Sequence, residues 1–291
     1  MKNLKKSVAV LLCLVMILMS LSAVAFAEEK QFYLVLGDSI GYGSGIRNSQ
    51  DACYGKIVAD TNGYEYANHA IPGHTTTNLI ARLKEDVVKA DVEKADIISI
   101  SIGGNDFLMS NLYGLMFDAM VKEDYSRFDE IAHSFYKNFS TIISMIRELN
   151  GEAVILMQTL YNPQSGYLRA PYQQGADRIN AAIEKFSKEN PGEIIIVDVA
   201  TALNSDMGNF ASDAIHPSAK GNEEIAKAVL SEIAKFSPEG KTEPVINVKG
   251  DDIKNATFAG TINAMGVFFH ILSLVLGPVY RFISKIPMPY M

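Results

Sequence analysis

The sequence has no tryptophan, only two cysteines in 291 residues, and fewer basic than acidic residues. Cys13 lies inside an apolar N-terminal run. Once that run is removed, Cys53 is the only cysteine left, so no intramolecular disulfide can form. The net charge of −7 argues against nucleic acid as a partner, because phosphate contacts need clustered Lys and Arg. The lack of tryptophan weighs against an aromatic platform for sugars.

Two patterns that hold cofactors are also missing. No group of His, Cys and carboxylate residues has metal-ligand spacing, so we predict no metal and no cofactor. Glycines at 41, 43 and 45 form a flexible turn, but no Lys-Ser or Lys-Thr follows them. This turn is therefore not a phosphate-binding loop.

Residues 1–27 have the three parts of a secretory signal peptide. Three lysines stand among the first six residues, an apolar run covers residues 8–21, and Ala25-Phe26-Ala27 forms a small-x-small cleavage site. We predict that the mature chain begins at Glu28. The protein would then be secreted or held at the cell surface.

Residues 28–236 alternate between buried strands and amphipathic helices. This alternation is typical of an α/β domain with a parallel sheet, and five strands predict a three-layer sandwich. The strands are expected at 32–36, 64–68, 96–102, 153–157 and 194–198, and helices at 54–60, 78–94, 125–149, 173–189 and 219–236. Loops at the carboxyl ends of the strands would gather on one edge of the sheet, where such folds bind ligands.

Ser39 is the candidate nucleophile. It follows the first strand in the sequence Gly37-Asp38-Ser39, with further glycines after it. A serine at the carboxyl end of such a strand stands where substrates bind. The alternative is a polar turn in which Asp38 and Ser39 only satisfy backbone groups.

A serine hydroxyl needs an adjacent base to act at neutral pH, and His216 is the best candidate. Asp213 precedes it by three residues, so its carboxylate can orient the imidazole and leave the second ring nitrogen for the serine. Asp198 is the second candidate acid. The alternative is that residues 213–217 are only a turn that starts a helix.

Acyl transfer also needs hydrogen-bond donors where negative charge develops on the substrate oxygen. We predict an oxyanion hole made by the backbone N–H groups of Ser39 and Gly73 and the side-chain amide of Asn105. Gly73 follows Pro72 in a turn, and Asn105 follows the third strand. Both therefore lie on loops expected at the same edge as Ser39.

Taken together, these residues resemble the SGNH hydrolase family of GDSL esterases and lipases. The likeness rests on residues 37–39, Gly73, residues 103–106 and residues 213–217, with Ile40 where the family has leucine. It covers about residues 32–236 and implies a flavodoxin-like fold. It implies the roles given above for the serine, the histidine, the aspartate and the three oxyanion groups.

Residues 107–120 follow the asparagine directly and are rich in Met and Phe. Such adaptable side chains suit an acyl chain, so we predict that Leu108, Leu112 and Met116 bind the substrate. The alternative is an ordinary core helix. The expected substrate is an acyl ester such as a lysophospholipid. The other functions considered are a carbohydrate O-acetylesterase at the cell surface and a surface binding protein without catalysis.

The C-terminal region is predicted as a linker, residues 237–256, and an apolar amphipathic helix or membrane segment, residues 257–291. An apolar stripe runs through Phe258, Ile262, Met265, Phe269, Leu272, Leu276, Val279 and Ile283, opposite Asn263, Gly266, His270, Ser273 and Gly277. Three interpretations stay open. Residues 257–285 could span a membrane, lie on its surface, or pack on the hydrolase domain over its cleft.

Overall fold

The computed structural model describes residues 30–254 and 256–284. The predicted signal peptide, residues 1–27, lies outside the described residues, as do residues 285–291 of the predicted C-terminal segment. The chain divides into a short first unit, residues 1–31, and a second unit, residues 32–291. All the helices and strands below belong to the second unit.

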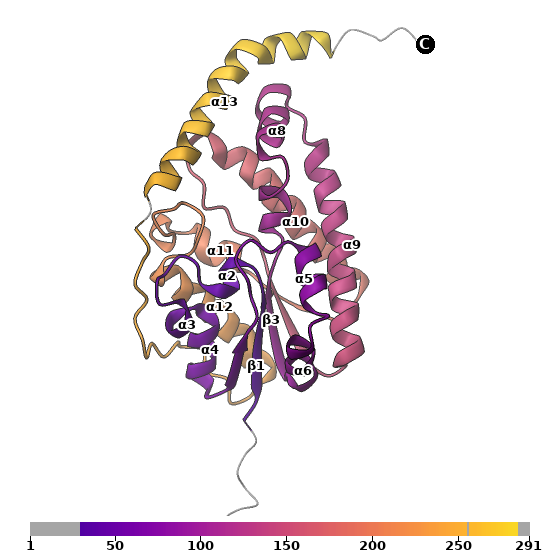
Figure 1. Cartoon of the computed structure of the whole chain (residues 1–291), viewed down its shortest axis with the longest axis vertical. Coiled ribbons are helices and arrows are strands. Elements are labelled where there is room, and N and C mark those ends of the chain that lie inside the picture. The colour runs from indigo at the N-terminus through magenta and orange to yellow at the C-terminus, as the bar shows by residue number, and fades with distance from the viewer. Residues whose placement is uncertain (1–29, 255, 285–291) are drawn as a thin grey trace, which may run out of the picture. The chain divides into compact units, whose positions relative to one another are not determined.

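A five-stranded parallel sheet forms the centre of this unit (Figure 1). The order β2-β1-β3-β4-β5 is that of a doubly wound, flavodoxin-like sheet, which confirms the predicted fold class. The strands are β1 (Phe32–Gly37), β2 (Glu65–Asn68), β3 (Ile97–Ser101), β4 (Val154–Gln158) and β5 (Ile195–Val197). The order reverses between β1 and β3, so a crevice is expected where these two strands end.

Helices cover both faces of the sheet and give three layers. One face packs against α5 (Thr76–Arg82), α6 (Asp86–Lys94), α9 (Ser126–Leu149) and α10 (Arg169–Glu189). The other packs against α4 (Tyr54–Asn62), α11 (Val199–Asn204) and α12 (Ala219–Phe236). The period-two alternation of a strand explains the two cores, because Leu34 and Leu36 point to the first face and Tyr33 and Val35 to the second.

Short elements connect these layers at the carboxyl edge of the sheet. They are α2 (Ser39–Tyr42), α3 (Ser49–Ala52), α7 (Gly104–Leu108), α8 (Leu112–Phe117), the π-turn η1 (Asp118–Lys122), and the 3₁₀ turns η2 (Gly166–Leu168) and η3 (Met207–Asn209).

The helix expected over 78–94 is two helices, α5 and α6. The N–H groups of Lys84 and Glu85 bond three residues back, which tightens the chain and ends α5. In one continuous helix, Leu83 and Val88 would point about 140° apart. The break allows both side chains to be fully buried against the sheet. Helix α10 also starts four residues before the expected position, with Pro171 in its first turn, where a missing N–H is tolerated.

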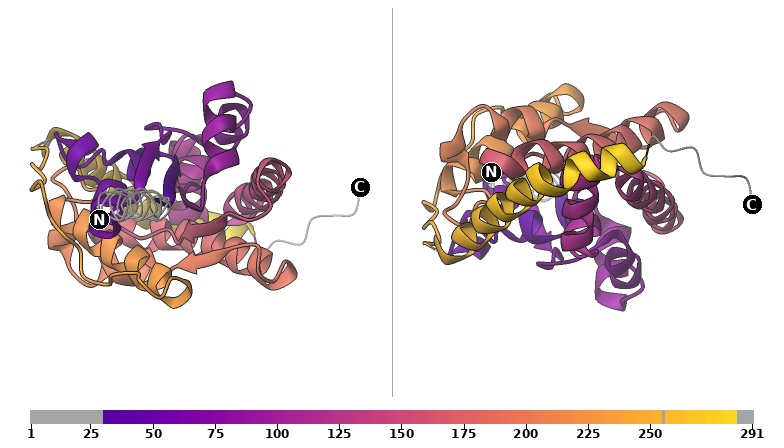
Figure 2. Two further views of the ribbon diagram at one scale, coloured as in Figure 1. Left: turned by 90° about the horizontal axis from the view of Figure 1, so that it is seen from below. Right: turned by 90° about the horizontal axis from the view of Figure 1, so that it is seen from above.

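Residues 237–254, here called the strap, connect α12 to the C-terminal helix α13 (Ala256–Ile283). The strap was predicted as part of a linker, and it is held along the domain by hydrogen bonds. Val245 N–H donates to the Thr61 hydroxyl (2.9 Å), and Ile253 N–H donates to the Gly45 carbonyl (3.0 Å). Figure 2 shows α13 crossing over the carboxyl edge of the sheet, so its first residues are fixed beside the loops that follow the strands.

Helix α13 is apolar on both faces. Ile262, Met265, Phe269 and Leu272 of the predicted stripe pack on the domain. The opposite side is not the small or weakly polar face expected, because Gly266 and Gly277 are buried. The residues that face outward are large and apolar instead: Val267, Phe268, Ile271, Leu274, Val275, Val279, Phe282 and Ile283.

Candidate active site

Ser39 stands at the first position of α2, directly after β1. The close pairing of β1 with β3 sets this turn, since Gly37 has φ +123° and lies opposite Ser101. A Cβ at position 37 would come within 1.9 Å of the Ser101 carbonyl oxygen. Only glycine allows the strand to end here and present the next side chains at the edge of the sheet.

Asp38 and Ser101 hold the turn in place. The Asp38 carboxylate accepts from Ile40 N–H (3.0 Å) and from the Ser101 hydroxyl (3.2 Å), and that hydroxyl accepts from Gly41 N–H (2.9 Å). Asp38 therefore braces the loop, as the polar-turn interpretation expects. Burial raises the pKa of Asp38 to about 7, although the bonds from Ile40 and Ser101 oppose the shift.

Asp213 and His216 form a hydrogen-bonded pair in the loop before α12. The Asp213 carboxylate lies 2.7 Å from His216 Nδ1 and accepts the N–H groups of Ile215 and His216, each at 3.0 Å. Burial alone would raise the pKa of Asp213. The hydrogen bonds from His216 and Ile215 outweigh it and lower this pKa, so the carboxylate stays ionised. An ionised carboxylate at Nδ1 keeps the proton on that nitrogen and leaves Nε2 as an acceptor.

Two residues that the sequence did not single out hold this loop. The Tyr161 hydroxyl donates to the Ile215 carbonyl, and the Gln164 amide donates to the Ala214 carbonyl, both at 2.8 Å. Ala214 itself has φ +58°, a strained conformation for a residue with a side chain. The two bonds stabilise that backbone. One feature of the sequence could have identified these two residues. Both follow β4 closely and so lie at the edge of the sheet where ligands bind.

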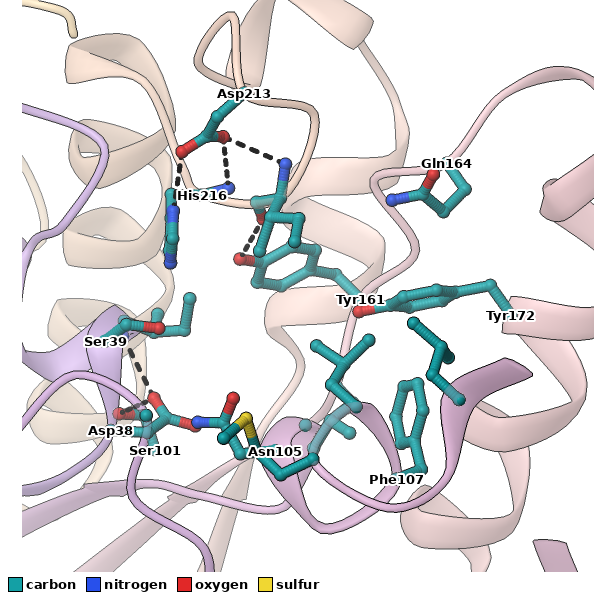
Figure 3. Close-up of a pocket in the computed structure, with 18 of the residues that line it drawn as sticks. Asp38, Ser39, Ser101, Asn105, Phe107, Tyr161, Gln164, Tyr172, Asp213 and His216 are labelled. Carbon is teal, nitrogen blue, oxygen red and sulfur yellow. Dashed lines mark hydrogen bonds and ion pairs between the residues drawn. The ribbon is translucent and has the colours of Figure 1, made fainter. Parts of the chain in front are cut away.

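Ser39, Asp213 and His216 line one cavity of about 500 Å³. In Figure 3 the imidazole lies between the Asp213 carboxylate and Ser39, and its second nitrogen points towards the serine. The structure shows no hydrogen bond between the described side chains of Ser39 and His216. Such contacts are often long before substrate binds. The residues predicted as nucleophile, base and orienting acid are thus brought together, and their catalytic roles stay predictions.

The three predicted oxyanion groups line the same cavity. Gly73 has φ +83°, and nothing lies within 4 Å of where its Cβ would be, so a substrate can approach its backbone. Among the described residues, no group accepts from the N–H of Ser39 or Gly73. The Asn105 amide donates one N–H to the His74 carbonyl (3.0 Å), which ties the α7 turn to the Gly73 turn. Its second N–H donates to no described residue, and a substrate oxygen there is still a prediction.

Two other acids, Asp198 and Asp106, have structural contacts instead. Asp198, the second candidate acid, caps α11 by accepting from Thr201 N–H (3.0 Å) and is not among the residues that line the cavity. Asp106 accepts from both the N–H and the hydroxyl of Thr76 at the start of α5. Asp106 therefore braces its loop.

The remaining described histidines also lie outside the group around Ser39. His69 pairs with Asp91 (2.7 Å), and His270 stacks on Tyr167 with ring centroids 3.8 Å apart. Burial lowers the pKa of His74, whose carbonyl accepts from the Asn105 amide. Within residues 30–254 and 256–284, no three His, Cys, Asp or Glu side chains gather in a way that could hold a metal ion.

Most of the rest of the cavity wall is apolar, although Gln158, Thr159 and Gln164 also line it. Leu108, Leu112 and Met116, the predicted substrate-binding residues, all line it. Further apolar residues line it from other elements: Phe107, Leu160, Leu168, Tyr172, Ile262 and Met265. Figure 3 shows Phe107 and Tyr172 on the side of the cavity away from His216. The cavity therefore has a polar end, at Ser39, and a mainly apolar remainder.

Comparison with known proteins places this site in a family. A model of the GDSL-like Lipase/Acylhydrolase family matches residues 35–224. The spore germination lipase LipC of Bacillus licheniformis is 28% identical over 208 residues, 67% of this chain and 92% of the lipase. An acetylxylan esterase of Geobacillus stearothermophilus is 29% identical over 178 residues, 59% of this chain and 73% of the esterase.

A solved structure supports the fold. The crystal structure of the lipase Lip_vut3 from a goat rumen metagenome superposes with a TM-score of 0.58 at 22% identity. The superposition covers 74% of this chain and the whole of the lipase. All the polar residues assigned above to the site lie inside the segment that the family model matches, whereas α13 lies beyond it.

Proposed function

Because the chain belongs to the GDSL-like Lipase/Acylhydrolase family, and is therefore an ester-hydrolysing enzyme, we propose that it cleaves acyl esters of lipid type, lysophospholipids among them. One observation carries the choice of substrate. The cavity of about 500 Å³ that Ser39 lines has, away from its polar end, walls made mainly of Leu, Met, Ile and aromatic side chains. Burial of an acyl chain against such walls stabilises the complex, whereas burial of a sugar hydroxyl against them does not.

The proposed reaction has two steps, and His216 moves the proton in both. The Ser39 hydroxyl attacks the ester carbonyl carbon while Nε2 of His216 takes its proton, and the Asp213 carboxylate stabilises the imidazolium. The N–H groups of Ser39, Gly73 and Asn105 bind the oxygen that becomes negative. His216 then protonates the leaving alcohol. In the second step the same nitrogen deprotonates a water molecule, which attacks the acyl carbonyl carbon. The bond to Ser39 Oγ then breaks, and His216 returns the proton to Oγ as the acid leaves.

The test is a series of p-nitrophenyl esters from acetate to decanoate, with lysophosphatidylcholine and acetylated xylan as candidate natural substrates. We expect kcat/KM to rise with the length of the acyl chain. The activity of Ser39→Ala should fall to the background rate, while its Tm stays equal to that of wild type. Activity confined to acetyl groups on xylan would contradict the lipid assignment and favour the acetylesterase alternative. If Ser39→Ala kept its activity, the nucleophile would be wrong.

Export is the second part of the proposal and rests on residues 1–27, whose sequence has the composition of a signal peptide. N-terminal sequencing of the protein recovered from the medium or the cell surface checks it. We expect a start at Glu28. An intact N-terminus on a cytoplasmic protein would contradict export.

We also propose that the outward face of α13 rests on a lipid surface. By length and composition, Ala259–Ile283 could cross a membrane, yet one face of α13 packs on the domain. The outward face carries Phe268, Leu274 and Phe282 at 57%, 65% and 70% exposure. Flotation with phosphatidylcholine vesicles tests it. Wild type should float, and Phe268→Ser/Leu274→Ser should remain in the dense fraction. Equal flotation of both proteins would contradict this contact.

A further inference from the structure

Helix α13 lies beyond the segment that the family model matches, yet it contributes to the cavity. Residues 35–224 match the family, and α13 begins at Ala256. Ile262 and Met265, one helical turn apart near its start, line the same cavity as Ser39. The cavity is therefore completed by an element that this chain adds after its hydrolase domain.

Several contacts seat α13 in this position. Gly266 passes so close to Leu168 that a Cβ would lie 3.0 Å from the leucine side chain. Phe269 is 3% exposed and packs in a cluster with Phe107, Leu115, Met116, Phe128 and Leu168. Because Phe107, Met116 and Leu168 of that cluster also line the cavity, the packing of α13 and the shape of the cavity depend on the same side chains.

Polar contacts further along the helix support the same position. His270 stacks on Tyr167 with an angle of 10° between the rings. At the far end, Arg281 pairs with Glu123 at 2.6 Å. Helix α13 is thus attached to η2 and to the chain after η1.

From this arrangement we propose that α13 forms the outer wall of the acyl-chain site, and that Ile262 and Met265 determine which chain lengths the enzyme prefers. The proposal rests on the proposed function, since it assumes that the cavity receives the acyl chain. Leu108, Leu112 and Met116 line the same cavity as Ile262 and Met265, so a saturated chain would lie among aliphatic side chains. Each methylene buried there is expected to raise kcat/KM roughly fourfold, which corresponds to ~0.8 kcal/mol.

Two of the isoleucines of α13, Ile262 and Ile271, provide a matched pair for the test. Ile262 lines the cavity, whereas Ile271 is 56% exposed on the outward face of the same helix. We would compare Ile262→Ala, Ile262→Phe and Ile271→Ala on p-nitrophenyl esters from acetate to decanoate, below the concentrations at which they form micelles. A Tm measurement on each variant shows whether the fold is intact.

We expect Ile262→Ala to lower kcat/KM for decanoate about tenfold and for acetate less than twofold. Ile262→Phe should move the preferred chain length to shorter esters, and Ile271→Ala should match wild type at every length. A uniform loss over all lengths in Ile262→Ala, or an equal change in Ile271→Ala, would overturn the proposal.

A second readout does not depend on turnover. Titration calorimetry with decanoic acid measures the chain site directly, and Ile262→Ala should bind the acid about tenfold more weakly than wild type and Ile271→Ala. If the acid binds in this way but no ester is cleaved, the proposed reaction fails and the wall assignment stands. If wild type does not bind the acid, or if all three proteins bind it alike, the wall assignment is wrong.

Discussion

Replacing Asp213 by asparagine changes the chemistry of the His216 pair with almost no change of shape. The carboxylate accepts from His216 Nδ1 and from the N–H groups of Ile215 and His216. The asparagine oxygen can keep the two backbone bonds, which leaves its NH2 group facing Nδ1. Nδ1 must then accept, so the imidazole proton moves to Nε2, the nitrogen that points towards Ser39. That nitrogen can no longer take the serine proton.

The size of the loss in kcat depends on which catalytic groups Asp213→Asn retains. The wrong tautomer lowers kcat about 10⁴-fold in a serine hydrolase of another fold, which is ~5.5 kcal/mol of transition-state stabilisation. The oxyanion donors are untouched, so we expect a fall of about 10³ to 10⁴-fold in kcat and little change in KM. The free energy of unfolding should fall by only about 1–2 kcal/mol, because one charge-assisted hydrogen bond becomes a neutral one.

The assay is steady-state hydrolysis of p-nitrophenyl butyrate, with Ser39→Ala as the background. Asp198→Asn is the matched control, because Asp198 caps α11 and does not line the cavity. We expect the control to keep at least half of the wild-type kcat. If folded Asp213→Asn retained more than a tenth of that kcat, or if Asp198→Asn lost as much as Asp213→Asn, the assignment of the orienting acid would be refuted.

Three further changes test the turn and the oxyanion hole. Gly37→Ala should lower the free energy of unfolding in urea by about 3–5 kcal/mol, because the new Cβ would lie 1.9 Å from the Ser101 carbonyl oxygen at a positive φ. Gly151→Ala is the control. No atom lies within 4 Å of its Cβ position, so it should change the free energy of unfolding by under about 0.5 kcal/mol. Burial raises the pKa of Asp38 to about 7, so the folded state holds a proton that the unfolded state has lost. Stability should therefore fall by up to about 4 kcal/mol from pH 4 to pH 7, and Asp38→Asn should remove this dependence; parallel stability curves for the two proteins would contradict it. Asn105→Ala should lower kcat on the butyrate ester about 10² to 10³-fold, and a loss expressed only in KM would exclude an oxyanion role.

The sequence was sufficient to predict which residues meet, because the topology of the fold determines their meeting. Ser39, Asn105 and His216 are far apart in the chain, but each follows a strand or lies at the edge where parallel strands end. In a doubly wound sheet these positions converge whatever the loop details are. The predicted strands were therefore sufficient to predict where the candidate site lies.

Other features depended on contacts that no local pattern carries. Tyr161 and Gln164 support the His216 loop through backbone carbonyls, and any hydroxyl or amide after β4 could have had that position. The periodicity of α13 identified only part of its buried face. Ile262, Met265, Phe269 and Leu272 of the predicted stripe pack on the domain. Val279 and Ile283 of the same stripe are exposed, because the outward side of the helix is apolar as well.

The strap has a consequence for the kinetics of α13. Hydrogen bonds fix it at Val245 and again at Ile253, three residues before α13 begins. If α13 leaves the cavity, its first turn therefore stays tethered beside the cavity. The return of α13 is then an intramolecular, first-order step, and its rate does not depend on protein concentration. The tether holds α13 at an effective concentration of roughly millimolar or above. An exchange of α13 between two copies of the chain would have to compete with this local return.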